Sequence, residues 1–388
     1  MTKKNRFILV ILFLYLAAFG QFNYNQIALY IFWPLVLVLS GISIKSLYNK
    51  EYCVYYVRLW FFFLLSWILA TNEANALVEI KMMLGVLLAV VTFYTLGDKY
   101  KNIPWMYGSF IVFYLGMIYY IYRNDLLLDF DYQTQRLDTD NLNANFFGYY
   151  TFYLTFSIFI LRDIIHGNIA KKIFEWLFFL MVPLSAGIAL LTASRQILIV
   201  QIPIISILFI IRYNNRNKLR NLFIALFAFL FIWIAFGHRI ESVFDNSLLN
   251  QRAQMDTGED ARTVHIIHAI QIGCENLIFG VGPGCYKHFA RGCFSHCSYT
   301  ELFANYGLFA VLFYMWILFH FVKTQWKRYR IYNDKFFLSF FTFGVIFIID
   351  NMFYVFYTGM WLMAFFFLVV IHSEHYYLNL KSKKNIFE

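Results

Sequence analysis

Long apolar runs separated by short polar or charged clusters form the main pattern of the chain. A run of about 17–25 predominantly apolar residues is long enough to cross a bilayer as an α-helix. The pattern predicts twelve such spans, and the eleventh is short because Asp350 and Asn351 end it. The predicted spans are 6–22, 27–45, 54–70, 77–96, 103–122, 144–161, 173–192, 196–211, 221–237, 299–322, 336–349 and 358–372.

The composition supports an all-α, polytopic transmembrane helical bundle. Of the 388 residues, 61% are hydrophobic and only 14% are charged, and the mean hydropathy is +0.59. Soluble domains contain about half apolar and one quarter charged residues, so an ordinary soluble globule is excluded. A disordered chain, collagen and a coiled coil are excluded as well. Only 5 prolines and 19 glycines interrupt the apolar runs, which suits helices in lipid.

The distribution of Lys and Arg predicts the orientation of the bundle. If the spans alternate, most of these residues fall on the side of Met1, including Lys3, Lys4 and the cluster 323–335. Cytoplasmic loops retain positive charge, so both termini are predicted to be cytoplasmic. Topology and contact with anionic lipid thereby explain the net charge of +10, which does not indicate a nucleic-acid partner. The first apolar run is interpreted as a span and not as a cleavable signal peptide. The eleven spans that follow need a twelfth for the distribution of Lys and Arg to agree with a cytoplasmic location of both termini.

The sequence predicts a single membrane domain, 1–388, because no linker or internal repeat is visible. The inner segments are short, whereas two outer segments, 123–143 and 238–298, are long. The working face is therefore expected outside, and the long outer loop 238–298 between spans nine and ten is expected to carry part of the site. The first outer segment contains five carboxylates, Asp125, Asp129, Asp131, Asp138 and Asp140.

Two ionisable residues lie near the outer end of the span 77–96. Glu79 and Lys81 are placed where they can reach an outward cavity, although residues two apart on a helix face different directions. Ionisable groups inside a membrane are costly, so each is a candidate for substrate binding. Structural pairing remains the alternative interpretation.

An arginine marks the turn between the spans 173–192 and 196–211. Arg195 follows Ser194 at this outer turn, at the depth of a lipid-linked phosphate. An arginine fork matches phosphate oxygens, and the adjacent helix N-terminus adds N–H donors. The alternative interpretation is an interfacial anchor.

A glycine-rich stretch lies in the middle of the outer loop 238–298. Gly280-Val281-Gly282-Pro283-Gly284 lacks the strand and spacing of a dinucleotide-binding fingerprint. It predicts a tight re-entrant turn, because its three glycines allow positive φ or a close backbone approach and the proline sets the bend. Gly282 and Gly284 are candidates for substrate binding.

A histidine and a tyrosine stand just before and at the start of the span 299–322. A free imidazole titrates near neutrality, so His296 at the water interface is a candidate for taking a proton from an incoming hydroxyl. A plain hydrogen-bonding role is the alternative. Tyr299 beside it is a candidate for substrate binding.

Four of the five cysteines lie in the outer loop. In an oxidising exterior a disulfide such as Cys285–Cys293 or Cys285–Cys297 is the default expectation, and the sequence does not fix the pairing among Cys274, Cys285, Cys293 and Cys297. A zinc site built from these residues lacks the usual C-x₂-C pair. Cys53 is expected to be free.

The order and sidedness of these motifs resemble the O-antigen ligase and polymerase superfamily, the WaaL and Wzy families. The resemblance covers about residues 183–310, and the rest of the chain resembles the family only in hydropathy and span count. The motifs that carry it are Ser194-Arg195, Arg262 ahead of an amphipathic stretch, Asn276 with Gly280 to Gly284, and His296 with Tyr299, Glu301 and Gly307. The sequence departs from the family in having Cys297 where an asparagine often follows the histidine.

The resemblance implies a membrane glycosyltransferase of the bacterial inner membrane with a periplasmic active face. It implies transfer of a glycan from undecaprenyl pyrophosphate to an acceptor hydroxyl, without a metal or other cofactor. Carried over to this chain, Arg195 and Arg262 hold the pyrophosphate, and His296 is the base or orienting residue at the acceptor. The implied partners are the undecaprenyl-pyrophosphate-linked donor, a glycan or lipid A core acceptor, membrane lipids and a chain-length regulator.

Three functions remain open at this stage. A repeat-unit polymerase of O-antigen or capsule is favoured, because acidic and tyrosine-rich outer segments suit sugar rings and repel the phosphorylated core of a lipid A acceptor. The alternatives are an O-antigen ligase, which completes lipopolysaccharide, and a flippase for the same lipid-linked glycan. A flippase is expected to show pseudo-symmetric halves with broken or charged helices at the midplane. The acidic segment is also explained as a solvated connection.

Overall fold

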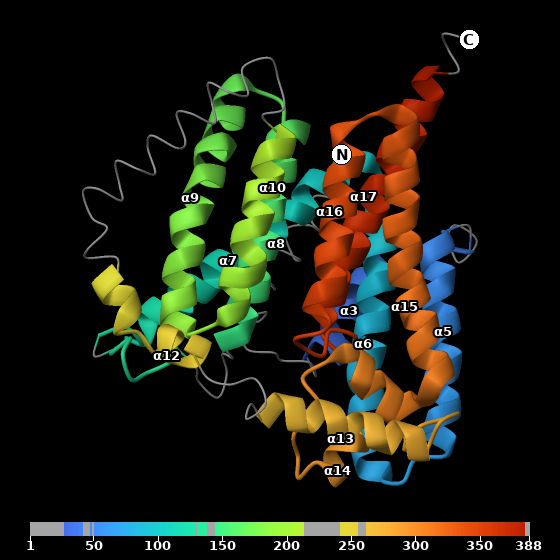
Figure 1. Ribbon diagram of the computed structural model, residues 1–388. Coiled ribbons are helices and arrows are strands. Elements are labelled where there is room, and N and C mark those ends of the chain that lie inside the picture. Colours follow the sequence, from blue (N-terminus) through green and yellow to red (C-terminus); the bar gives the residue numbers. More distant parts are fainter. Residues whose placement is uncertain are drawn as a thin grey trace. The chain divides into compact units, whose positions relative to one another are not determined.

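The computed structural model describes residues 27–41, 47–48, 50–128, 130–137, 144–212, 241–254 and 261–384. Within these ranges the chain is helical and contains no strand, which confirms the all-α prediction (Figure 1). Five helices are long and apolar enough to cross a membrane: Glu73–Gly97, Tyr100–Arg123, Asn168–Thr192, Ser298–Tyr332 and Met360–Ser382. The described residues therefore fit a multi-pass membrane protein.

Most predicted spans coincide with a helix. The matching α-helices are α5 (Glu51–Ile68), α6 (Glu73–Gly97), α7 (Ile103–Arg123), α8 (Ala144–Ile164), α9 (Asn168–Thr192), α15 (Ser298–Tyr332), α16 (Lys335–Asp350) and α17 (Met360–Lys384). The predicted span 27–45 corresponds to the π-helix η2 (Ala28–Phe32) and α3 (Trp33–Ser40), and the span 196–211 to the π-helix η4 (Ile197–Gln201) and α10 (Ile202–Arg212). The spans 6–22 and 221–237 lie outside the described residues, so the count of twelve and the orientation stay predictions.

Local sequence explains where several helices begin and end. The side chain of Asn72 accepts a hydrogen bond from the backbone N–H of Asn75 and caps α6, with Glu73 in the first turn. Asp334 caps α16 in the same way through Phe336 N. At the other end of a helix, Ala193 adopts a left-handed conformation with φ 45° and terminates α9.

The described residues form two compact units. The first contains residues 27–109 and 261–384, and the second contains residues 110–212 and 241–254, in both cases with the gaps stated above. In the first unit α17 packs against α6 and α16, and α15 packs against α5, α13 and α16. In the second unit α9 packs against α8, η4 and α10. Formation of one membrane domain by the whole chain stays a prediction.

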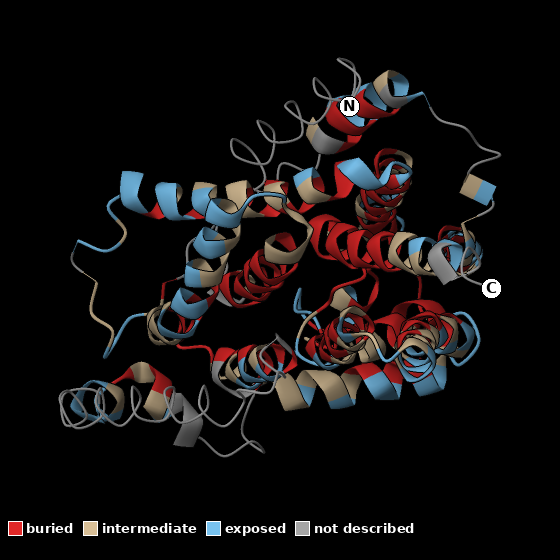
Figure 2. Cartoon of the chain, turned by 90° about the horizontal axis from the view of Figure 1, so that it is seen from above, coloured by how far each residue is buried: buried red, intermediate tan, exposed pale blue. Residues whose placement is uncertain are grey.

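Burial differs strongly between the helices. In the most apolar stretch of α17, 72% of the residues are buried, against 28% in that of α9. Figure 2 shows buried residues along most of the length of some helices and exposed residues on one side of others. Within the first unit, α17 is therefore a central helix whose side chains are covered by its neighbours.

The predicted outer loop 238–298 is partly helical. It contains α12 (Leu248–Gln254), α13 (Ala261–Glu275) and the short helix α14 (Tyr286–Phe289). In the first unit, α13 runs across one end of α6 and α15 (Figure 1). This end lies opposite the C-terminal end of α17.

A single glycine breaks α15 near this end. Gly307 has φ 79° and ψ −177°, so the short segment Ser298–Tyr306 meets the rest of α15 at a kink. The backbone N–H of Leu308 donates to the carbonyl of Leu277 at 2.8 Å, and a Cβ on Gly307 would overlap the carbonyl oxygen of Ile278. The chain after α13 therefore closes directly on the kink.

Candidate functional site

The glycine-rich stretch forms the predicted tight turn. Gly280, Gly282 and Gly284 have φ values of 65°, 105° and 63°, which confirms the expectation of positive φ. A Cβ on Gly282 would lie 2.5 Å from the Cα of Ala70, and one on Gly284 would lie 2.9 Å from Oε2 of Glu79. Both glycines are therefore required for the close approach of this turn to the start of α6. Their predicted contact with substrate stays a prediction.

Backbone hydrogen bonds join the turn to α15 and to the chain before α6. Val281 N donates to Ala304 O at 2.9 Å, and Gly282 N donates to Asn305 O at 3.0 Å. Thr71 N donates to Val281 O at 3.0 Å. The turn thus links α15 to the chain just before α6, two segments that are distant in sequence, and this places its residues next to Glu79.

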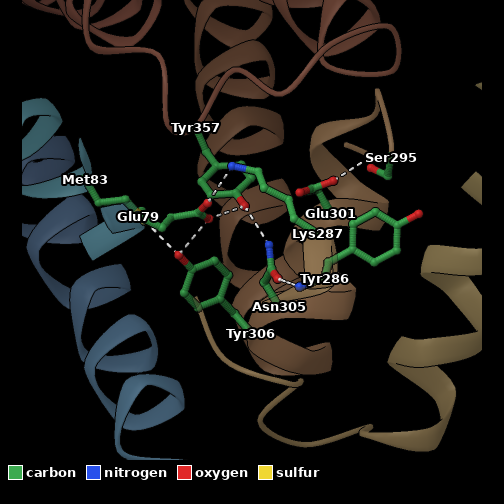
Figure 3. A network of polar contacts seen from close by, with 9 residues as sticks. All are labelled: Glu79, Met83, Tyr286, Lys287, Ser295, Glu301, Asn305, Tyr306 and Tyr357. Atoms are coloured by element: carbon green, nitrogen blue, oxygen red, sulfur yellow. Dashed lines mark hydrogen bonds and ion pairs between the residues drawn. The ribbon is translucent and has the colours of Figure 1, made fainter. Parts of the chain in front are cut away.

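Glu79 is the centre of a buried polar network (Figure 3). Its Oε1 accepts hydrogen bonds from the hydroxyls of Tyr306 at 3.1 Å and Tyr357 at 2.9 Å. Its Oε2 forms an ion pair with Nζ of Lys287 at 3.7 Å. The Glu79 side chain is only 3% exposed and the Lys287 side chain is 23% exposed, so the lysine is the outer member of the pair.

Asn305 closes the network into a ring. Its Oδ1 accepts a hydrogen bond from Tyr286 N at 2.8 Å, and its Nδ2 donates to the hydroxyl of Tyr357 at 3.3 Å. Tyr286 is the neighbour of Lys287, so α14 is connected to Glu79 by two routes. This double connection restricts the position of the Lys287 backbone.

A second buried carboxylate lies beside Lys287 in Figure 3. Glu301 is 1% exposed, and its Oε2 accepts a hydrogen bond from Ser295 N at 2.6 Å. Its Oε1 is buried without a hydrogen-bond partner among the described residues. Two buried carboxyl groups, Glu79 and Glu301, therefore lie near Lys287.

Aromatic rings connect Lys287 to His296. Nζ of Lys287 lies 4.3 Å from the ring centroid of Phe294. The ring of His296 lies 6.5 Å from the ring of Phe294 and 6.3 Å from that of His265 on α13. Since Arg262 is one turn before His265 on α13, the first unit gathers its predicted residues Glu79, Arg262 and His296 at one end.

The chain at His296 is held in an unusual conformation. His296 has φ 60°, a left-handed value that is uncommon outside glycine, and it is half-buried. The next residues are fixed to the connection between α16 and α17, because Ser298 N donates to Asn351 O and Ser298 Oγ donates to Tyr354 O, each at 2.8 Å. The hydroxyl of Tyr299 donates to Ile348 O at 2.9 Å, which gives this predicted site residue a structural role.

Tyr286 anchors the short helix α14 to α13. Its hydroxyl donates to the carbonyl oxygen of His265 at 2.8 Å. Burial, together with the negative charge of Glu301, raises the pKa of the Tyr286 phenol above its ordinary value. Tyr286 is therefore a neutral hydrogen-bond donor at neutral pH.

Lys81 does not belong to the polar network. On α6, Ala76, Glu79, Ile80 and Met83 are buried, whereas Lys81 is exposed. A separation of two residues on a helix corresponds to about 200°, so the two side chains leave the helix in different directions. The partner of Glu79 is therefore Lys287, which the sequence analysis did not select.

The predicted disulfides are absent, and this expectation is wrong for the structure. All five cysteines are free, with Cys274 and Cys293 exposed and Cys53, Cys285 and Cys297 buried. The Cys285 thiol donates to the carbonyl of Asn72 at 3.3 Å and is used in packing the turn against α6. Among the described residues, no group of three or more His, Cys, Asp and Glu side chains is arranged to hold a metal ion.

Arg195 lies at the predicted turn in the second unit. Ser194 N donates to Ala189 O at 3.2 Å, and Ile197 N donates to Ser194 O at 3.2 Å, which shapes the turn between α9 and η4. Arg195 is half-buried there. A second arginine, Arg136, donates through Nε to Thr192 O at 2.8 Å, and the sequence analysis did not single it out.

An apolar cavity of about 540 Å³ lies in the same unit. Side chains of α7, α8 and α9 line most of it, and Asp125 lies at its wall. Of the other carboxylates in the acidic segment, Asp131 accepts hydrogen bonds from Gln133 N and Thr134 Oγ1, and these lower the pKa of its carboxyl. Asp129, Asp138 and Asp140 lie outside the described residues.

The fold and site describe a multi-pass helical protein with a polar cluster at one end of its first unit. Comparison with protein-family models and with curated proteins finds no match for the chain.

Proposed function

We propose that the chain transfers a glycan from undecaprenyl pyrophosphate to an acceptor sugar hydroxyl, and that it acts as a repeat-unit polymerase. The observation that carries this proposal is the cluster formed by Glu79, Lys287, Phe294, His296 and His265 in the first unit. It combines fixed positive charge, titratable groups and an exposed aromatic ring, which are the groups needed for a pyrophosphate leaving group and a sugar acceptor.

Charge and position favour an outward-facing site. The cluster lies where α15 begins, whereas Lys323, Lys327, Arg328 and Arg330 lie in the last turns of the same helix. Positive residues concentrate on the cytoplasmic side, so the opposite end of α15 is expected to face the periplasm. A lipid-linked donor presented on that face needs no nucleotide.

The residues have separate roles in this proposal. Arg262 contacts the pyrophosphate, because an arginine keeps its charge and its fork matches phosphate oxygens. His296 orients the acceptor or takes its proton. In the second unit, Arg195 keeps its predicted phosphate-binding role, and the apolar cavity suits a polyprenyl chain.

Deletion of the gene in the source bacterium tests this function. A polymerase mutant is expected to display a single repeat unit on its surface carrier. A ligase mutant is expected to lose surface attachment and to accumulate long chains on undecaprenyl pyrophosphate. Long unattached chains would exclude a polymerase but agree with glycan transfer from undecaprenyl pyrophosphate by a ligase. Unchanged glycans would exclude both the polymerase and the ligase.

A further inference from the structure

We propose that Glu79, Lys287 and Phe294 bind the acceptor sugar, with Oε2 of Glu79 as the atom that accepts the proton of the attacking hydroxyl. This inference rests on the proposed function and specifies its acceptor side. It assigns proton removal to a carboxylate on α6 and leaves His296 the role of orienting the acceptor.

The two oxygens of Glu79 differ in their hydrogen bonds. Oε1 already accepts two tyrosine hydroxyls. Oε2 has no hydrogen bond from the described residues, and its ion-pair distance of 3.7 Å to Lys287 exceeds a direct hydrogen bond. Oε2 therefore retains the capacity to accept a hydrogen bond from a ligand.

A sugar hydroxyl matches this pair chemically. A hydroxyl donates one hydrogen bond and accepts others, so it can donate to Oε2 of Glu79 and accept from Nζ of Lys287. The lysine is the more exposed member and has a flexible side chain, so its displacement opens a route to the buried carboxylate. Charged partners strengthen both hydrogen bonds.

An aromatic surface completes the subsite. Phe294 is 39% exposed, and its ring lies next to the ammonium of Lys287. An aromatic face beside polar groups suits the apolar face of a sugar ring. The same ring contacts His296, so one side chain links the proposed acceptor position to the candidate orienting residue.

The proposed transfer forms one bond and breaks another. The acceptor hydroxyl oxygen bonds to C1 of the donor sugar, and the bond between C1 and the pyrophosphate oxygen breaks. Undecaprenyl pyrophosphate leaves with the bonding electron pair. The hydroxyl proton passes to Oε2 of Glu79, which later releases it to water.

The test separates catalysis from packing with Glu79→Gln, Lys287→Met and the double variant. Lys287→Met leaves a buried carboxylate without its ion pair and is expected to be unstable, whereas the double variant removes both charges and is expected to regain stability. Transfer is measured with the purified full chain in liposomes and an undecaprenyl-pyrophosphate-linked repeat unit as donor and acceptor. Thermal unfolding in detergent is measured in parallel.

The double variant is expected to unfold near the wild-type temperature and to transfer at least about 100-fold more slowly, the usual contribution of a general base. Glu73→Gln, an exposed glutamate on the same helix, is the matched control and is expected to keep full activity. If the double variant is stable and transfers glycan at the wild-type rate, the inference is wrong but the proposed function is not affected. Absence of transfer by the wild-type chain would overturn the proposed function and the inference with it.

A pH profile assigns the proton step to one residue. A carboxylate acts as a base only in its ionised form, so a carboxylate base predicts a wild-type rate that falls on the acid side. The residual rate of Glu79→Gln is expected to lack this fall. If the rate of Glu79→Gln still falls at acid pH and the rate of His296→Ala does not, His296 is the base. That result would overturn the inference.

Discussion

Glu79 depends on two tyrosine hydroxyls for its position inside the first unit. Tyr357 donates to Glu79 and also accepts from Asn305, so Tyr357→Phe removes two hydrogen bonds of the network. A hydrogen bond to a charged group contributes about 1.5–3 kcal/mol. We expect Tyr357→Phe to lower the free energy of unfolding by about that amount, measured by denaturation in detergent.

Tyr48→Phe provides the control for this prediction. Tyr48 is 75% exposed, so loss of its hydroxyl is expected to change the free energy of unfolding by less than about 0.5 kcal/mol. Equal stability of the Tyr357 and Tyr48 variants would show that the buried hydrogen bonds of Glu79 contribute little.

The two predicted phosphate-binding arginines are tested by glycan transfer. Each proposed phosphate contact would stabilise charge that develops on the leaving group, so Arg262→Ala and Arg195→Ala are each expected to lose about 2–4 kcal/mol of transition-state stabilisation. Arg→Lys at either position is expected to retain only part of the wild-type transfer rate, because an ammonium group lacks the bidentate fork of a guanidinium. The measurement is the initial transfer rate at equal amounts of membrane-inserted protein.

Near-normal rates from both alanine variants would identify these arginines as interface anchors. His296→Ala is a separate test, and its full activity would remove only the role of His296 at the acceptor. A comparison at equal protein amounts is required because both arginines are half-buried and contribute to packing.

The kink of α15 depends on one glycine. The φ and ψ of Gly307 belong to a region that is almost restricted to glycine, and its lack of a side chain admits the carbonyl of Ile278. Gly307→Ala is therefore expected to cost about 1–3 kcal/mol from backbone strain, in addition to the overlap. The unfolding temperature in detergent reports this loss.

Gly85→Ala on α6 is the matched control. A Cβ there meets only Sδ of Met360 at 3.6 Å, which is an ordinary contact. Alanine in a helix is favoured over glycine by roughly 0.5–1 kcal/mol, so this variant is expected to be as stable as the wild type or more stable. If Gly85→Ala lowers the unfolding temperature and Gly307→Ala does not, the kink of α15 does not require glycine at position 307.

The orientation of the whole chain is tested with reporter fusions. The charge distribution predicts that a reporter active only outside works after Gly237 and fails after Asn333. Asn333 is a suitable junction because it follows the last residue of α15 and adopts a left-handed conformation with φ 49°. The opposite pattern, or equal activity at both positions, would reject the predicted topology and the outward site.

The extent of the helices was largely predictable from the sequence. Apolar runs identified α5 to α10 and α15 to α17 because a helix in lipid must satisfy its backbone hydrogen bonds internally and expose apolar side chains. Helix ends were less predictable. The apolar run 299–322 extends as a helix to Tyr332, because Arg, Lys and Gln side chains are good helix formers beyond the apolar region.

The contents of the site were only partly predictable. Glycine spacing indicated the turn at Gly280 to Gly284, because positive φ is a local property of these residues. Lys287 had no distinguishing local signal, since it is one basic residue among several in the outer loop. A signal was nevertheless present in Glu79, because a carboxylate inside a predicted span requires a partner.

The sequence by itself determined the helical class, the apolar runs and the positions of the glycine turn, because hydropathy and backbone freedom belong to single residues and short segments. Only the tertiary structure decided that Glu79 pairs with Lys287 and not with nearby Lys81. The helix directs neighbouring side chains to different sides, whereas the turn that closes on α6 and on the Gly307 kink brings a distant lysine to the buried carboxylate.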